Sequence, residues 1–237
     1  MRTIFIIGLL VCISMYASRV STTVAKNTTI QVHSLPNPAV ILREGELLLK
    51  EGDLVLRLNS DPASQFIKNF NRRDKRYSHA GIVVYEKGYP YVYHMVNGAE
   101  NPGERLRKDS LARFADPRKN TALGIYRYDL DKTETARLKK WIHQWYAKGI
   151  QFDSAFNYAT DRRMYCTEMI SKLLDRASAG RITIAFTRPT ATEAALFSTY
   201  MQLPLSYTSR LRLVAPDNLF LHPACRLVKA YDFTKPV

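Results

Sequence analysis

The stretch 162-RRMYCTEMISKLLD-175 guides the interpretation of the whole chain, because an amphipathic helix begins in it at a cysteine. The helix is predicted over about residues 165–177, and its apolar face consists of Met169, Ile170, Leu173, Leu174 and Ala177. Counting back four residues from Ile170, or seven from Leu173, places Cys166 on the same face. We therefore expect the thiol to face the protein core from the first turn of this helix.

A thiol in the first turn of a helix has a physical reason to be reactive. Unpaired backbone N–H groups and the helix dipole stabilise a thiolate and are expected to lower the thiol pKa, and the same groups can stabilise an oxyanion. Three other interpretations stay open: a buried structural cysteine, a disulfide between Cys166 and Cys225, and a zinc site formed by Cys166, His79 and His94. A nucleophilic thiol also needs a base nearby.

Two of the five histidines are placed to supply that base. His79 and His94 lie on predicted strands at 79–86 and 90–97, which a turn at Gly88 joins into a hairpin. Side chains on paired strands lie close together, so one histidine can act as the base while the other orients it. The remaining histidines fall in less suitable places: the polar leader (His33), the polar side of a predicted helix (His143) and the proline-rich tail (His222).

The remaining pattern predicts an α+β fold with a mainly antiparallel sheet. Further strands are expected at 53–58, 121–129 and 225–233, and helices at 61–70 and 131–149. The rest of the tail, from 181 to 237, contains five prolines and is expected to be irregular. No linker interrupts residues 45–237, which we therefore predict to form a single domain.

The N-terminus resembles a secretory signal peptide over residues 1–25. Arg2 precedes a short apolar segment at 4–13, and Ala17 and Ala25 offer cleavage ends. The apolar segment is too short for a comfortable membrane span, although a retained N-terminal anchor remains the alternative. Residues 26–44 are expected to form a polar leader. The chain is thus predicted to be exported to the periplasm or the cell envelope.

The charge of the chain suggests an anionic partner. The formal net charge is +14, and removal of residues 1–25 takes away two arginines and no acids, which leaves 14 − 2 = +12. Such a surplus suits a cell wall or phospholipid head groups, while solubility alone is the competing explanation. The basic run NRRDKR (71–76) has no nucleic-acid recognition motif around it, so we expect no nucleic-acid partner. No cofactor motif is present.

Four short motifs in this order resemble the YiiX/YebB-like cysteine hydrolases, circularly permuted relatives of the NlpC-type, papain-like peptidases. The motifs are GDLVL (52–56), SHAGIVV (78–84), YVYHM (91–95) and YCTEMI (165–170). The resemblance covers about residues 45–177. It implies a permuted papain-like fold whose antiparallel sheet packs against the helix that carries the cysteine. It also implies that Cys166 is the nucleophile, His79 the base and His94 the third polar residue.

The predicted activity is that of an exported cysteine hydrolase that forms an acyl-enzyme. The resemblance favours an amide bond in a cell-wall peptide as the target. A lipid acyl hydrolase or acyltransferase of the same fold is the first alternative, and a non-enzymatic module that binds the cell envelope is the second. Glu168 lies about 200° around the helix from Cys166, so we expect a structural role for this acid. Asp153 is expected to form a turn, and Tyr165 to line the cleft.

Overall fold

A computed structural model describes residues 37–98 and 101–234 of the chain. The predicted signal peptide at 1–25 and most of the predicted leader lie outside these ranges. Among the described residues, no helix is both long and apolar enough to span a bilayer.

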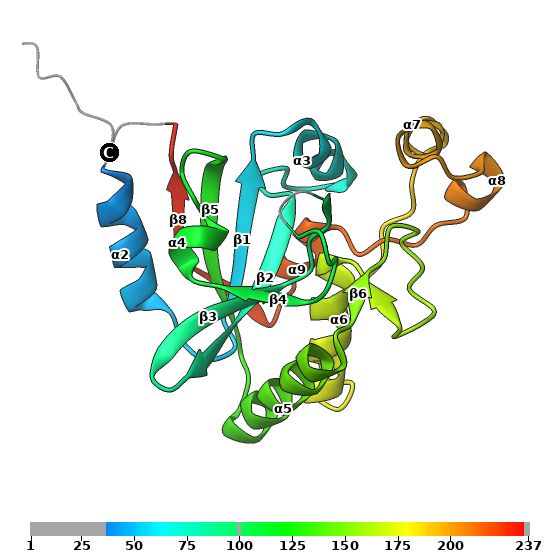
Figure 1. Cartoon of the computed structure of the whole chain (residues 1–237). Helices are drawn as coiled ribbons and strands as arrows, with labels where there is room; N and C mark the ends of the chain where they lie inside the picture. The colour runs from blue at the N-terminus through cyan, green and yellow to red at the C-terminus, as the bar shows by residue number, and fades with distance from the viewer. Residues whose placement is uncertain (1–36, 99–100, 235–237) are drawn as a thin grey trace, which may run out of the picture. The chain divides into compact units, whose positions relative to one another are not determined.

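The centre of the fold is a six-stranded sheet with the order β4-β3-β2-β1-β5-β8, in which all neighbours run antiparallel (Figure 1). Its strands are β1 (Leu54–Asn59), β2 (His79–Glu86), β3 (Tyr89–His94), β4 (Arg107–Asp109), β5 (Asn120–Tyr128) and β8 (Cys225–Asp232). The predicted hairpin and the other predicted strands are confirmed. The sequence analysis missed β4, because three charged residues show no apolar alternation.

Two amphipathic helices cover one face of the sheet. Helix α5 (Lys132–Lys148) begins with a capping box between Asp131 and Glu134 and ends at Gly149, whose φ of 63° is the left-handed conformation that suits glycine. Helix α6 (Cys166–Ala177) packs against α5 and against β2. The apolar residues of both helices and of the facing strands form the larger core, so the helix that carries the cysteine is anchored directly to the strand that carries His79.

The other face of the sheet is covered by α2 (Pro38–Leu48) and α4 (Leu111–Phe114). Ile41 of α2 packs there with Val55, Val83 and Leu111 in a second core. Helix α2 begins inside the segment expected to be a leader, because the Asn37 side chain caps it and proline fits its first position. The packed part of the chain therefore starts before residue 45.

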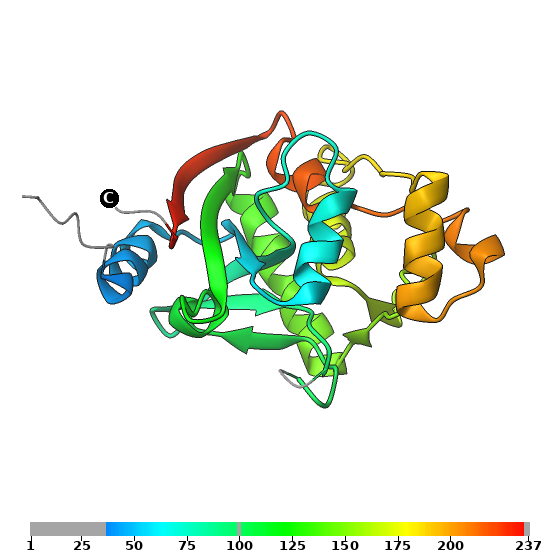
Figure 2. The ribbon, with the colours of Figure 1, turned by 90° about the horizontal axis from the view of Figure 1, so that it is seen from above.

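The tail is more ordered than its prolines suggested. It contains α7 (Ala191–Met201), α8 (Leu205–Thr208) and α9 (Pro216–Phe220) before β8. A capping box between Thr190 and Glu193 starts α7, so the sequence does contain a local signal for this helix. Helices α7 and α8 lie to one side of the sheet, beyond α3 (Pro62–Ile67) (Figure 2). Phe66 of α3 stacks on Tyr200 of α7 with 4.9 Å between ring centroids.

Three smaller elements complete the described chain. The 3₁₀ helix η2 (Lys68–Phe70) continues α3, so that together they fill the helix predicted at 61–70. Strands β6 (Gln151–Phe152) and β7 (Arg163–Met164) form a separate parallel pair just before α6. This pair brings the chain to the start of the helix that carries Cys166.

Candidate active site

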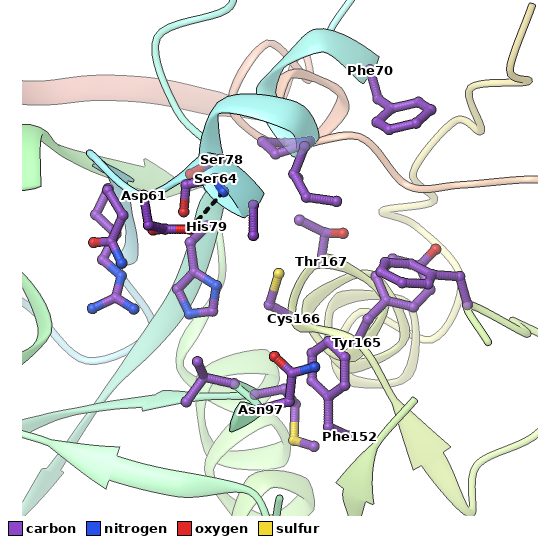
Figure 3. Close-up of a pocket in the computed structure, with 18 of the residues that line it drawn as sticks. Asp61, Ser64, Phe70, Ser78, His79, Asn97, Phe152, Tyr165, Cys166 and Thr167 are labelled. Atoms are coloured by element: carbon purple, nitrogen blue, oxygen red, sulfur yellow. Dashed lines mark hydrogen bonds between the residues drawn. The ribbon is translucent and has the colours of Figure 1, made fainter. Parts of the chain in front are cut away.

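A cavity of about 650 Å³ lies where the first turn of α6 meets the start of β2. Cys166 and His79 both line it, and Figure 3 shows their side chains pointing into the same space. The two residues come from β2 and α6, which are far apart in the sequence. Packing of α6 on β2 brings both side chains to the wall of the same cavity.

The thiol of Cys166 is half-buried and unbonded to any other sulfur. Cys166 and Cys225 are both free, so the disulfide alternative is wrong. Burial raises the pKa of the Cys166 thiol, and hydrogen bonds from backbone groups of Ala80 and Thr167 only partly offset this rise. The expected lowering by the helix terminus therefore does not dominate, because desolvation penalises the thiolate more strongly.

The two predicted histidines are in direct contact. Nε2 of His79 lies 2.9 Å from Nδ1 of His94, and Nε2 of His94 lies 3.0 Å from Oδ2 of Asp109. His79 begins β2, His94 ends β3 and Asp109 ends β4, so three neighbouring strands each supply one member. We call His79, His94 and Asp109 the histidine relay.

The charge state of Asp109 determines which ring nitrogens of His94 and His79 are protonated. Burial opposes ionisation of Asp109, but hydrogen bonds with His94 and Arg107 outweigh it and lower the pKa to about 2. The carboxylate can only accept, so His94 donates from Nε2 and presents an unprotonated Nδ1. His79 then donates from Nε2 to this nitrogen. Its own Nδ1 is left with a lone pair, as a general base requires.

Both imidazoles are neutral at neutral pH. The pKa of His94 is lowered to about 4, chiefly by burial; the hydrogen bond with Asp109 opposes this lowering, and the charges of Arg57 and Arg107 add to it. Burial also lowers the pKa of His79 well below its usual value, with smaller contributions from Arg57 and His94. A neutral His79 can take a proton from the thiol, whereas an imidazolium cannot.

Arg57 places a fixed positive charge beside the relay. It lies opposite His79 in the β1–β2 register, is 4% exposed, and donates from Nη1 to the carbonyl oxygen of Phe114 at 2.6 Å. Its charge lowers the pKa of both relay histidines and of the Cys166 thiol. Arg57 therefore favours the thiolate of Cys166 and the neutral imidazoles of both histidines, and it disfavours the imidazolium that forms when His79 takes the thiol proton.

A single aromatic ring holds the two histidines in place. The Phe114 ring contacts the rings of His79 and His94 at centroid distances of 5.8 and 5.1 Å. Gly81 leaves room for this packing, because a Cβ there would lie 2.4 Å from Cγ1 of Val92 and 3.2 Å from the Phe114 ring. The glycine of the SHAGIVV motif is thus a steric requirement of the site.

The neighbouring polar residues have structural roles, as expected. Glu168 is fully buried, ion-pairs with Lys172 at 2.8 Å and accepts from the Tyr165 backbone N–H at 3.2 Å. Asp153 accepts from the backbone N–H groups of Ala155 and Asn157 in a turn. Tyr165 lines the cavity, and its hydroxyl accepts from the backbone N–H of Val214.

Sequence reasoning missed two members of the site, Asp109 and Arg57. Asp109 lies in the short charged strand β4 and carries no motif of its own. Arg57 did leave a signal, because it is the one charged residue in the strand predicted at 53–58 apart from Asp53. A charge inside a strand that is otherwise apolar indicates a paired or functional side chain.

The cavity has two walls of different character. In Figure 3, Asp61, Ser64 and Ser78 lie on the side of His79, and Phe70 lies on the other side of the Cys166 sulfur. The rest of the apolar wall comes from η2, α7 and the segment before α9, and its further members are Phe197, Tyr200, Met201 and Leu213. A substrate bound beside Cys166 would therefore contact a polar wall on one side and an apolar wall on the other.

The geometry does not fit the zinc alternative. Both ring nitrogens of His94 already have partners in the relay, so this residue has no lone pair to offer a metal. Within residues 37–98 and 101–234, no three His, Cys, Asp or Glu side chains are grouped so that they could hold a metal ion.

Comparisons with known proteins identify the family and the fold. A model of the permuted papain-like amidase enzymes, the YaeF/YiiX or C92 family, matches residues 48–229. Among solved structures, the crystal structure of the metalloprotein yiiX from Escherichia coli O157:H7 superposes with a TM-score of 0.59 and 17% sequence identity. The match covers 77% of this chain and 97% of that one, and at this identity it shows a shared fold. No curated protein matches the chain.

Proposed function

Because the chain belongs to the family of permuted papain-like amidases, we propose that it is an exported cysteine amidase that uses Cys166 as its nucleophile. The observation that carries this proposal is the relay, which leaves an unprotonated nitrogen of His79 in the cavity that the thiol lines. The proposed roles are nucleophile for Cys166, general base for His79, and positioning for His94 and Asp109.

The first half-reaction moves the thiol proton to His79 while sulfur attacks the amide carbonyl carbon. The resting pair is a neutral thiol and a neutral imidazole, so proton transfer accompanies attack. The carbonyl oxygen becomes an oxyanion, which the Cys166 backbone N–H at the start of α6 is placed to stabilise. The protonated His79 then donates its proton to the departing amine, and a thioester on Cys166 remains.

The second half-reaction hydrolyses this thioester. His79, neutral again, removes a proton from water as the water oxygen attacks the acyl carbon. The acid leaves, and the proton returns to the sulfur. Throughout the cycle the Asp109 carboxylate stabilises positive charge on the histidines, because it accepts from His94 while His94 accepts from His79.

The cell-wall peptide remains the first candidate substrate, since export and positive charge both suit an anionic envelope. The polar wall of the cavity, with Asp61, Ser64 and Ser78, offers partners for a peptide. A lipid acyl amide or ester is the second candidate, and the apolar wall at Phe70, Phe197 and Met201 favours it. Such a wall would hold an alkyl chain beside the thiol.

A comparison of two cysteine variants tests the proposed chemistry. Cys166→Ala is expected to abolish turnover while the melting temperature stays close to that of the unaltered protein. Cys225→Ala serves as the matched control, because Cys225 is the other free cysteine of the described residues and lies on β8. Mass spectrometry of the reacting protein should find the acyl adduct on Cys166. Full turnover by Cys166→Ala would refute the mechanism.

Two defined substrates separate the candidate bonds. A cell-wall peptide amide and an N-acyl amide with a long alkyl chain are each incubated with the protein, and released amine, peptide and fatty acid are measured. Peptide release supports the first candidate and fatty-acid release the second. If neither substrate leaves an adduct on Cys166 and iodoacetamide does not label this thiol at any pH, the non-enzymatic binding module is favoured.

A further inference from the structure

The segment from α7 through α8 differs from the rest of the chain in its lack of charge. Residues 194–209 contain no charged side chain, whereas 24% of all residues are charged. We call this segment, with the arginines that flank it, the apolar arm. Figures 1 and 2 both show its helices at the end of the domain beyond α3, away from the central sheet.

The apolar arm exposes large apolar side chains. Leu196 is 55% exposed, Tyr200 is 48% exposed and Leu205 on α8 is 53% exposed. Leu196 and Tyr200 are four residues apart and lie on the same face of α7, while Ala194 and Phe197 face the core. Exposed apolar side chains gathered in one region indicate a surface that another molecule covers.

Exposed arginines flank the uncharged stretch. Arg188 precedes α7, and Arg210 and Arg212 follow α8. The only acid between Arg181 and Ala215 is Glu193, and it is ion-paired with Arg72 at 2.5 Å. The arm therefore combines an apolar tip with a positively charged base, the distribution that suits the interface between acyl chains and anionic head groups.

We propose that the apolar arm docks on an anionic lipid surface. Leu196, Tyr200 and Leu205 enter the interfacial region, and the flanking arginines contact lipid phosphates. Charge decides between this occupant and a second copy of the chain, because self-association through the arm would bring the same arginines of two strongly basic molecules together. An anionic bilayer removes this repulsion and covers the apolar tip in the same contact.

Docking in this way also orients the active site. Tyr200 and Met201 belong to α7 and line the cavity that contains Cys166. The same helix thus forms part of the lipid-facing surface and part of the cavity wall, so docking turns this side of the cavity toward the membrane. The docking itself does not depend on the proposed amidase chemistry, and it is tested in the Cys166→Ala protein.

Site-specific fluorescence tests the proposal without interference from the apolar segment at 4–13. Leu205→Trp is introduced into the full-length Cys166→Ala chain, and vesicles of phosphatidylglycerol and brominated phosphatidylcholine are added. The matched control is Leu227→Trp, because Leu227 is 50% exposed on the edge strand β8. Trp141 and Trp145 give the same background in both proteins. We expect the brominated lipid to quench the indole introduced at 205 and to leave the one at 227 unchanged.

Affinity measurements complete the test. Leu196→Glu with Leu205→Glu should weaken binding to phosphatidylglycerol vesicles by at least about tenfold. Leu47→Glu with Leu227→Glu adds the same charge at exposed leucines elsewhere and should change affinity by less than about twofold. Equal loss in both double variants would overturn the proposal, as would absence of quenching at 205. Concentration-dependent dimers that the arm variant abolishes would instead assign the surface to a second copy.

Discussion

Asp109 and Glu168 are both buried carboxylates of this domain, and their environments have opposite effects on them. Asp109 has a pKa of about 2, because hydrogen bonds with His94 and Arg107 outweigh the effect of burial. Burial instead raises the pKa of Glu168 to about 7, and the hydrogen bond with Lys172 only partly offsets it. One acid is held ionised, while the other is half-protonated near neutral pH.

The difference shows that nearness in sequence is a poor guide to the site. Glu168 is two residues from Cys166, yet the helical turn directs it to Lys172 and to the backbone of Tyr165. Asp109 lies on another strand and reaches the site through antiparallel pairing, in which His94 stands opposite Arg107. We therefore assign Asp109 to the function and Glu168 to the fold.

The largest effect should come from removing the base. His79→Ala is expected to lower kcat/KM by roughly 10³-fold, because no other group can take the thiol proton. His143→Ala is the control, since His143 is partly exposed on α5 and stands outside the site. Steady-state kinetics of both variants make the comparison. Loss of activity in His143→Ala equal to that in His79→Ala would remove His79 from its assigned role.

Neutralising Asp109 should have the next largest effect. In Asp109→Asn the amide can donate to His94, which reverses the tautomers of the relay and places a proton on Nδ1 of His79. We expect kcat to fall on the order of 10²-fold with KM nearly unchanged. Nitrogen NMR of the histidines provides a second readout, because it reports which ring nitrogen carries the proton. Unaltered tautomers together with full activity would contradict the relay.

Glu168→Gln should change stability and spare catalysis. The folded-state pKa of about 7 lies above the ordinary 4.5, so the folded protein binds more protons than the unfolded chain between these pH values. The contribution of Glu168 is therefore largest below pH 4.5 and is lost as pH rises to 7, by an amount on the order of 3 kcal/mol. Thermal melts should show Glu168→Gln more destabilised, relative to the unaltered protein, at pH 5 than at pH 8. Its kcat/KM should stay within about threefold.

The smallest effect should follow from Arg57→Met, which removes the positive charge beside the relay. Because burial dominates the pKa of His79 and Arg57 contributes second, that pKa should rise modestly toward 6.5. The acidic limb of the kcat/KM profile should shift upward by less than about one pH unit. Arg226→Met, on the outer strand β8, is the charge-matched control and should leave the limb in place. A downward shift for Arg57→Met would mean that the Arg57 charge raises the pKa of His79, which is opposite to the effect assigned to it.

Much of the fold was predictable from the chain because its periodicities are strong. Helix α5, which was predicted at 131–149, has an apolar face, a capping box and a terminal glycine, and all three are local signals. The β2–β3 hairpin follows from two β-branched runs around Gly88. Helix α7 was not predicted, because Pro189 and Pro204 on either side of it are typical of an irregular segment. Strand β4 was missed because its three residues have no strand preference of their own. Only the pairing with β3 makes this segment a strand.

Local patterns in the sequence predicted five of the six strands of the sheet, the helices α5 and α6, and Cys166, His79 and His94 as candidate site residues. They could do so because helix and strand patterns are local, and because reactive residue types are few. Tertiary structure alone decided that Asp109 completes the relay and that Arg57 sets its electrostatics. It also reversed the expected lowering of the Cys166 pKa, since desolvation depends on what surrounds the sulfur. Burial and long-range pairing involve residues distant along the chain, and no local pattern encodes them.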